Sequence, residues 1–300
     1  MSRSAAAANR ADVYTRVTSE IITAIESGAS GWRMPWHHNG SPITRPTNVQ
    51  SSQRYRGINV LALWVAANNA GYVDGLWGTY KQWQAAGAQV RKGERATTVV
   101  LWKEFKPNQH NNEDEGSDDD RRRRLFARAF WVFNHSQVEN YDPPARPVLP
   151  EAGRIAEADR FFAGLQIPMV SGHHDAHYRI DEDRVYMPDF GSFASPADFA
   201  GTLFHEAGHA TGAKHRLDRD FGMGFGDRAR AMEEAVAELT ASYVLADLGI
   251  AHHPRPDHAA YIASWLKLLK DDPRAIFTAA SKAQQAADWM HAQQQERAAA

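Results

Sequence analysis

The pattern His-Glu-x-x-His, formed by His205, Glu206 and His209, constrains this chain more than any other feature of its sequence. Side chains four residues apart share one face of an α-helix, so a helix here would bring both imidazoles to one cation and place Glu206 beside it. The flanking residues favour that helix, because Ser195 is a good N-cap and Gly212 can end it. We therefore predict a metal site rather than two histidines of a core or a surface.

A downstream acidic segment offers a third metal ligand. The segment EEAVAE at residues 233–238 resembles the second helix of gluzincins, in which a glutamate binds the metal and an acid four residues later hydrogen-bonds a metal-bound histidine. This resemblance implies that Glu234 is the ligand and that Glu238 orients the ring of His205 or His209. Two acids on a largely apolar helix face are costly unless they are paired or bind a metal.

A competing third ligand is His215. The segment HEAGHATGAKH matches the metzincin pattern HExxHxxGxxH, which implies a third histidine ligand after a turn at Gly212. Metzincins also need a methionine-containing turn below the metal, and Met223 is only a loose candidate for it. We favour Glu234 over His215 for this reason, and a site that uses neither is the remaining alternative.

If the site is catalytic, its residue types define the chemistry. We expect one divalent metal ion, Zn²⁺, bound through nitrogen and oxygen because the chain has no cysteine. Glu206 would act as the base in peptide-bond hydrolysis. An oxyanion donor is also needed, and the sequence leaves Tyr178, Tyr186, Tyr243 and His215 as candidates. A structural zinc site is the alternative use, but such sites seldom place a free glutamate beside the metal.

Charge and tryptophan are distributed unevenly along the chain. Residues 1–140 contain 18 Lys and Arg against 13 Asp and Glu, whereas residues 141–300 contain 16 against 23. Most of the tryptophans also lie in the first half, and a basic, aromatic surface is typical of proteins that follow phosphates and stack bases. The chain has no apolar run of about 18 residues and no convincing signal peptide, so we expect a cytoplasmic protein without a membrane partner.

Periodicity and turn residues predict a mixed α and β first half and a mainly helical second half. We expect a domain at 1–140, a proline-rich linker at 141–150 and a second domain at 151–300, with a disordered insertion at 107–124 between two strands. A strand at 184–187 is expected to lie at a sheet edge and pair with an extended peptide. The predicted helices span 12–27, 59–69, 79–86, 152–164, 195–212, 227–248 and 257–270.

Basic and aromatic residues of the first half fall on loops and element ends, where binding groups usually lie. Five cations are expected to contact phosphates, and four aromatic rings are candidates for stacking on bases. The cations are Arg54, Arg56, Lys81, Arg91 and Lys92, and the rings are Trp32, Trp36, Tyr55 and Trp83.

Several first-half motifs, together with TLFHEAGHATG and EEAVAE, resemble ArdC-type antirestriction proteins over nearly the full length. These motifs are W-x-x-PW (32–36), YRGIN (55–59), TYKQW (79–83), VRKGE (90–94) and FNHSQV (133–138). The resemblance implies an α+β protein with a small N-terminal domain that binds single-stranded DNA and a C-terminal zincin-like metallopeptidase domain with a short edge sheet. It also implies carriage on conjugative plasmids and protection of incoming DNA from host restriction.

Three functions are compatible with these expectations. The first is an antirestriction protein that binds single-stranded DNA and acts on a protein substrate or on the host restriction machinery. The second is a DNA-tethered protease that cleaves DNA-bound proteins and resembles the SprT-like repair proteases. The third is a binding protein that protects DNA by occlusion and uses its metal domain as a scaffold.

Overall fold

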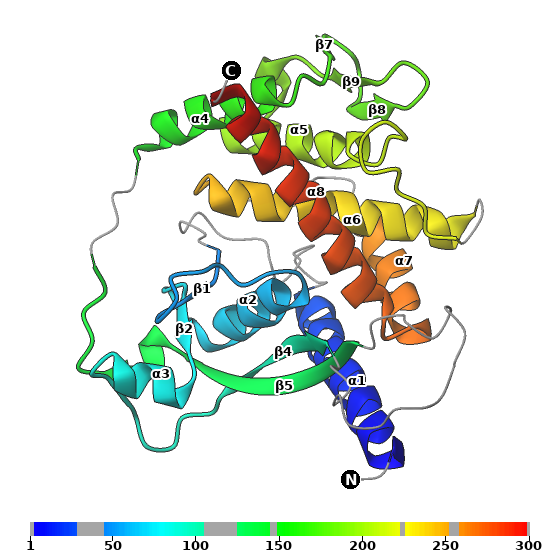
Figure 1. Cartoon of the computed structure of the whole chain (residues 1–300). Coiled ribbons are helices and arrows are strands. Elements are labelled where there is room, and N and C mark those ends of the chain that lie inside the picture. The colour runs from blue at the N-terminus through cyan, green and yellow to red at the C-terminus, as the bar shows by residue number, and fades with distance from the viewer. Residues whose placement is uncertain are drawn as a thin grey trace, which may run out of the picture.

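The computed structural model describes residues 3–28, 45–104, 125–144, 149–222, 226–251 and 258–298. The chain folds into two lobes, with α1 to α3 and β1 to β6 in one and α4 to α8 and β7 to β9 in the other (Figure 1). Helices dominate both lobes and the sheets are small, which confirms the predicted α+β class. No helix in the described part of the chain is both long and apolar enough to cross a membrane.

The first lobe is built around a four-stranded sheet with the strand order β1-β2-β5-β4. The β4–β5 pair is antiparallel and forms most of the sheet, while β3 and β6 form a separate two-stranded sheet. The predicted insertion at 107–124 lies between β4 and β5, outside the described residues. The elements are α1 (Arg3–Gly28), β1 (Thr47–Asn48), α2 (Ile58–Ala70), β2 (Leu76–Gly78), α3 (Tyr80–Ala85), β3 (Gln89–Val90), β4 (Thr97–Glu104), β5 (Leu125–Asn134), a 3₁₀ turn (His135–Gln137) and β6 (Val138–Glu139).

The motifs TYKQW and FNHSQV fold against each other. Thr79 and Gln82 form a reciprocal capping box at the start of α3, and Asn134 and Gln137 form another at the 3₁₀ turn. Trp83 is fully buried, and its indole N–H donates to the carbonyl of Phe133 at 3.0 Å. The prediction that Trp83 stacks on bases is therefore wrong, because both faces of its ring are covered by the core.

The second lobe carries a three-stranded sheet and the long helices. Its elements are α4 (Glu151–Gly164), β7 (Met169–Ser171), β8 (His177–Arg179), β9 (Arg184–Met187), a 3₁₀ turn (Phe190–Ser192), α5 (Pro196–Ala210), α6 (Asp227–Asp247), α7 (His258–Asp271) and α8 (Ala275–Ala298). The strand order is β7-β9-β8, so β9 is central. The expectation that residues 184–187 pair with a peptide is wrong, because both edges of β9 are occupied by β7 and β8. The sequence did not predict β7. The two edge strands of this sheet are β7 and β8, and β8 contacts α5.

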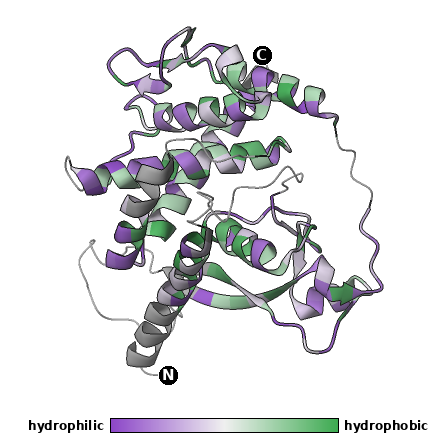
Figure 2. Ribbon diagram, turned by 180° about the vertical axis from the view of Figure 1, so that it is seen from behind, coloured by the Kyte–Doolittle hydropathy of each residue, from purple (hydrophilic) through white to green (hydrophobic). Residues whose placement is uncertain are grey.

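Hydrophobic side chains join the two lobes in one core. Buried residues of α1 and α2 pack in the same cluster as those of α4 to α8, and hydrophobic residues run along the helices that face this core (Figure 2). Polar groups cross the same contact, since the Tyr243 hydroxyl of α6 donates to the Gly57 carbonyl at 2.9 Å. The predicted domain boundaries at 140 and 151 stay predictions, but the two parts are not independent in their packing.

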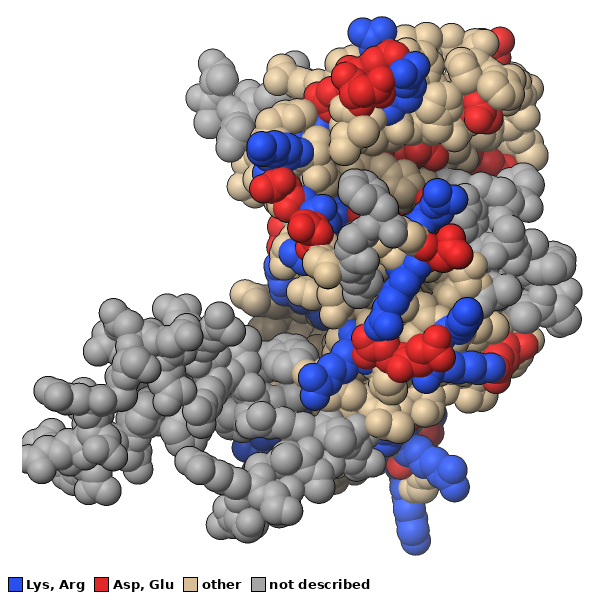
Figure 3. Space-filling view, turned by 90° about the vertical axis from the view of Figure 1, so that its right-hand side faces the viewer, with Lys and Arg blue, Asp and Glu red and all other residues tan. Residues whose placement is uncertain are grey.

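Acidic and basic side chains interleave on the face seen in Figure 3, so its described part does not form a large area of one charge sign. Two of the predicted phosphate contacts form ion pairs with acids of the second lobe. Arg54 forms an ion pair with Asp247 of α6 at 2.9 Å, and Arg56 forms one with Asp288 of α8. These arginines therefore tie the first lobe to the second, a role that the sequence did not predict.

A close approach of α5 and α6 requires glycine at position 208. A Cβ atom there would lie 2.9 Å from the Ala237 Cα of α6, whereas a Cβ at Gly201 of the same helix would meet nothing within 4 Å. We expect Gly208→Ala to lower the free energy of unfolding by about 1 to 3 kcal/mol through overpacking. Urea unfolding in the presence of a chelator measures this effect without a contribution from bound metal.

The matched control is Gly201→Ala. It adds the same methyl group to the same helix and should stabilise the chain by about 0.5 to 1 kcal/mol, because alanine is the better helix former. Equal effects of the two substitutions would contradict the close approach as the reason for glycine at position 208.

Candidate metal centre

The helix α5 positions the first two candidate ligands as its sequence predicts. Ser195 caps the helix by accepting a hydrogen bond from the Asp198 N–H at 3.1 Å, and a proline follows in the first turn. His205 and His209 lie one turn apart, and their Nε2 atoms face each other at 3.1 Å. Local capping and helical periodicity are therefore sufficient to form this half of the site.

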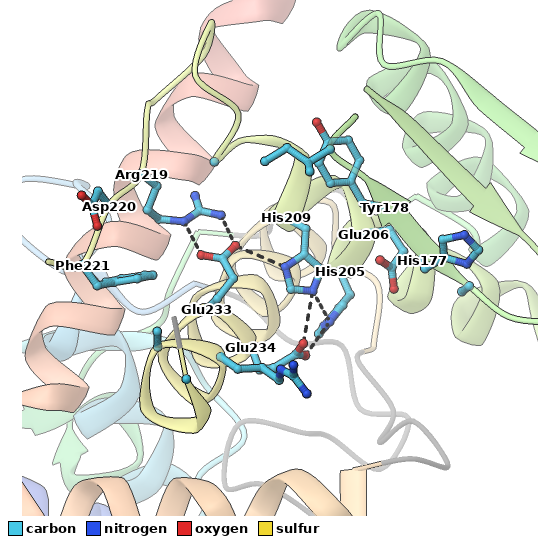
Figure 4. A pocket seen from close by; sticks show the side chains of 16 residues that line it. His177, Tyr178, His205, Glu206, His209, Arg219, Asp220, Phe221, Glu233 and Glu234 are labelled. Atoms are coloured by element: carbon cyan, nitrogen blue, oxygen red, sulfur yellow. Dashed lines mark hydrogen bonds and ion pairs between the residues drawn. The ribbon is translucent and has the colours of Figure 1, made fainter. Parts of the chain in front are cut away.

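The helix α6 supplies the acids that surround the two imidazoles (Figure 4). The Glu234 carboxylate lies 3.3 Å from His205 Nε2 and 3.7 Å from His209 Nε2. His215 does not join this group, because its Nε2 lies 3.1 Å from Asp183 and its side chain is 60% exposed. The structure thus brings together His205, His209 and Glu234, while Met223 of the competing pattern lies outside the described residues.

Each imidazole also faces an acid through its second nitrogen. Glu238 lies 3.2 Å from His205 Nδ1, and Glu233 lies 3.2 Å from His209 Nδ1. A carboxylate at Nδ1 favours the tautomer with hydrogen on that atom, so both Nε2 lone pairs point at the same space. Two facing lone pairs repel each other unless a cation or a proton lies between them.

The donor set fits a tetrahedral divalent ion. Two nitrogens that each lie about 2.0 to 2.1 Å from such an ion are about 3.4 Å apart. The observed separation of 3.1 Å between the Nε2 atoms, and the 3.3 Å from His205 Nε2 to Glu234, are close to that value. These three residues could hold the metal, with one position left for water or substrate.

Glu233 was not predicted to have a role, although it lies in the quoted segment EEAVAE. Its carboxylate accepts hydrogen bonds from Arg219, whose guanidinium also donates to the Gly208 carbonyl at 2.9 Å and to Thr211 Oγ1 at 2.8 Å. Burial raises the pKa of Glu233, but the hydrogen bonds from Arg219 and His209 outweigh it and hold the pKa at about 2. Glu233 is therefore ionised at neutral pH and holds the ring of His209. No pattern in the sequence alone singles out this role, because the loop after α5 carries both Arg216 and Arg219.

We expect Glu233→Gln to weaken metal binding by about 10 to 100-fold, which is the usual cost of losing an acid that orients a ligating histidine. Equilibrium metal titration of the full chain measures the affinity. Asp220→Asn is the matched control, because Asp220 lines the same cavity without a described contact to either imidazole. An unchanged affinity for Glu233→Gln would show that Glu233 does not orient His209.

Glu206 lines the same cavity of about 660 Å³ as the three candidate ligands, and its side chain is buried. It lies on the side of the histidines that faces β8, which carries His177 and Tyr178 (Figure 4). A carboxylate in this position can exchange a proton with a water or substrate held beside the metal ligands. The cavity also places the outer edge strand β8 next to Glu206, where an extended chain could lie.

The three candidate tyrosines differ in their access to the cavity. Tyr178 lines it, although its hydroxyl donates to Asp183 at 2.7 Å, and burial followed by this hydrogen bond raises its pKa to about 12. Tyr186 donates to Glu182 and is not among the lining residues. Tyr243 is fully buried and donates to the Gly57 carbonyl. The prediction that Tyr243 is an oxyanion donor is therefore wrong, because its hydroxyl lies in the core between the lobes, and Tyr178 is the best placed of the three.

The predicted DNA-binding residues occupy different environments. Trp32 and Trp36 lie outside the described residues. Tyr55 is half-buried, and its hydroxyl accepts a hydrogen bond from Asn48 at 3.2 Å. Lys81, Arg91 and Lys92 are exposed, and Arg91 is paired with Glu94 at 2.8 Å. An aromatic residue that the sequence did not select is Trp131 of β5, which is 57% exposed.

Two family models match different parts of the chain. Residues 11–133 match the model of the N-terminal domain of anti-restriction factor ArdC, and residues 156–282 match a zincin-like metallopeptidase model. The chain is 56% identical over 287 residues to the uncharacterized protein y4eC of Sinorhizobium fredii, covering 94% of this chain and 92% of that protein. It is also 35% identical over 295 residues to the DNA primase TraC of Escherichia coli, but spans only 27% of the length of TraC.

Two solved structures cover almost the whole chain. The metal-free crystal structure of the antirestriction ArdC protein from plasmid R388 superposes with a TM-score of 0.77 and 35% identity, covering 94% of this chain and 97% of that one. The Mn(II)-bound structure of the same protein gives a TM-score of 0.73 and covers 93% of this chain. Because sequence identity and fold agree over nearly the full length, this chain belongs to the ArdC family of antirestriction proteins and carries a zincin-like metallopeptidase domain.

Proposed function

We propose that this protein protects incoming plasmid DNA from host restriction during conjugation. In this proposal residues 1–140 bind single-stranded DNA, residues 151–300 carry a zinc-dependent peptidase site, and the protein acts in the cytoplasm of the recipient cell. The observation that carries the proposal is the convergence of His205, His209 and Glu234 beside Glu206 in one cavity of a chain of the ArdC family. The R388 protein, which is encoded on a plasmid, supports the conjugative setting.

The peptidase part of the proposal assigns a task to each group of the centre. A zinc ion, when bound, supplies a Lewis acid that lowers the pKa of water and polarises a carbonyl. Glu206 takes a proton from the attacking water and passes it to the leaving amine. Glu238 and Glu233 keep the rings of His205 and His209 in the ligating tautomer and orientation.

Substrate positioning falls to the outer edge of β8. The inner edge of β8 is paired with β9, so the outer edge offers backbone groups to an extended polypeptide beside the cavity. Tyr178 lies on this strand, and its hydroxyl is the oxyanion donor in this proposal once it leaves Asp183. In this proposal the substrate is an extended segment of a protein of the host restriction machinery.

The DNA-binding part of the proposal assigns phosphate contacts to Lys81 and Lys92 and base stacking to Trp131. The lysines are exposed at the start of α3 and in the turn after β3, and Trp131 is the exposed tryptophan of β5. Arg54 and Arg56 are less suitable, because a phosphate would have to compete with Asp247 and Asp288 for them. The proposed DNA-binding surface is still basic and aromatic, as the sequence predicted. The residue that stacks on bases is now Trp131.

Salt dependence of binding to single-stranded DNA tests the assignment. We expect Lys81→Ala/Lys92→Ala to reduce the slope of log K against log salt by about 1.4, since each phosphate contact on a single strand contributes about 0.7. Trp131→Ala should weaken binding by about 5 to 150-fold with an unchanged slope, because stacking releases no counterions. Fluorescence anisotropy over a range of NaCl concentrations measures both quantities.

The control for this experiment is Arg160→Ala, an exposed cation of α4 in the other lobe, which should change neither the affinity nor the slope. A parental slope for the double lysine variant would remove Lys81 and Lys92 from the interface.

Plasmid transfer into restricting and non-restricting recipients tests the biological role, and an equal benefit in both recipients would contradict antirestriction.

A further inference from the structure

A second group of metal-ligating side chains lies on the segment between β7 and β8. One donor atom from each of His173, Asp175 and His177 lies within 4.8 Å of the others, as is also true of His205, His209 and Glu234. Residues 172–176 form a bent connection between β7 and β8, and His177 is the first residue of β8. This group shares no residue with the centre on α5 and α6.

The strand β9 fixes both ends of this segment. The backbone N–H of His173 donates to the Met187 carbonyl at 3.0 Å. His177 begins β8 opposite Tyr186, and the two rings stack with centroids 5.1 Å apart and an interplanar angle of 14°. The imidazoles of His173 and His177 are thus held 4.8 Å apart, centroid to centroid, by sheet pairing rather than by each other. Such preorganisation is what a metal site requires of its ligands.

The contacts inside the group favour a cation. The single Oδ1 atom of Asp175 lies 2.8 Å from His173 Nδ1, 3.2 Å from His174 Nε2 and 3.4 Å from His177 Nδ1. The buried Nδ1 atom of His177 has no hydrogen-bond partner among the described residues. A carboxylate surrounded by three imidazoles, one of which has a buried and unsatisfied nitrogen, concentrates lone pairs that a metal ion could satisfy together.

We propose that His173, Asp175 and His177 bind a second divalent transition-metal ion at the rim of the cavity. Two imidazoles and one carboxylate suit Zn²⁺, Co²⁺ or Ni²⁺ and not Ca²⁺ or Mg²⁺, which prefer oxygen ligands. The site is partly open to solvent, so water completes the coordination and the ion binds more weakly than at the α5–α6 centre. Donors around a tetrahedral ion lie about 3.3 Å apart, so the Asp175 side chain moves by about half an ångström on binding.

Equilibrium dialysis with Zn²⁺, using the untagged and chelator-treated full chain, tests this proposal. The parent should bind two ions, and His173→Ala/His177→Ala should bind one. Asp175→Asn, which removes the charged ligand at nearly constant size, should weaken the second ion by at least about 10-fold. His174→Ala is the matched control and should bind two ions, because the 82% exposed His174 side chain is not one of the three ligands.

The Glu234→Ala variant separates this proposal from that for the α5–α6 centre. It should keep the rim ion alone, and its combination with His173→Ala/His177→Ala should bind none. A parent that binds one ion, a double histidine variant that binds two, or a loss of the second ion in His174→Ala would overturn the rim site. Thermal unfolding of the chelated variants checks that these substitutions leave the fold intact.

Discussion

Glu234→Ala is expected to lose the metal ion of the α5–α6 centre. The Glu234 carboxylate lies 3.3 Å from His205 Nε2 and 3.7 Å from His209 Nε2, so its removal leaves two ligands where three converge. Loss of an orienting acid alone weakens metal binding by about 10 to 100-fold, and loss of a direct ligand should exceed that. Competition titration with a metal-binding dye would give the affinity, and the stabilisation of thermal unfolding by metal should fall accordingly.

The control for this experiment is His215→Ala. His215 is exposed and pairs with Asp183, away from the converging Nε2 atoms, so its variant should keep parental affinity for the α5–α6 ion. Parental affinity in Glu234→Ala together with metal loss in His215→Ala would reverse the assignment and restore the metzincin pattern. The rim site does not interfere with this comparison when His173→Ala/His177→Ala serves as the common background.

Glu206→Gln is expected to abolish peptide hydrolysis while leaving metal and DNA binding at parental levels. The substitution keeps the size of a buried side chain and removes its ability to accept a proton, so the loss should be about 100 to 10,000-fold in rate. Cleavage of an unstructured polypeptide, followed by mass spectrometry, measures the rate. Hydrolysis by Glu206→Gln at the parental rate would rule out Glu206 as the base.

The same variant distinguishes the mechanisms of DNA protection. If protection depends on proteolysis, a plasmid that encodes Glu206→Gln should transfer into restricting recipients no more often than a plasmid that lacks the gene. Full protection by this variant would support occlusion by a DNA-binding protein whose metal centre is a scaffold. Glu234→Ala in the same assay shows whether the metal is needed for protection even where hydrolysis is not.

The elements that the sequence predicted well are those with local signals. The helices α2, α5 and α6 begin and end within a residue or two of their predicted bounds, because apolar periodicity and glycine stops act over a few residues. Residue 195 caps α5 as expected. The strand β7 escaped prediction because its three residues are exposed and carry no alternation that would mark a buried face.

The errors concern residues whose environment depends on distant segments. Trp83 was expected to be a binding residue, yet folding places it against Phe133, 50 positions away. The sequence also did not show that Arg54 pairs with Asp247 of α6, although its predicted phosphate contact stays a prediction. In both cases the local sequence does not show whether the side chain is buried or paired. Burial and pairing depend on how distant segments pack against each other.

The sequence by itself determined the pair His205 and His209 with Glu206, because one turn of a capped helix is enough to align them. It could name Glu234 and His215 as third ligands but could not choose by geometry, since that choice depends on how closely α6 approaches α5. The tertiary structure decided it through the contact at Gly208, which brings the acids of α6 to the imidazoles. The role of Glu233 also depends on tertiary packing. Its hydrogen bond from Arg219 forms only when the loop after α5 packs on α6.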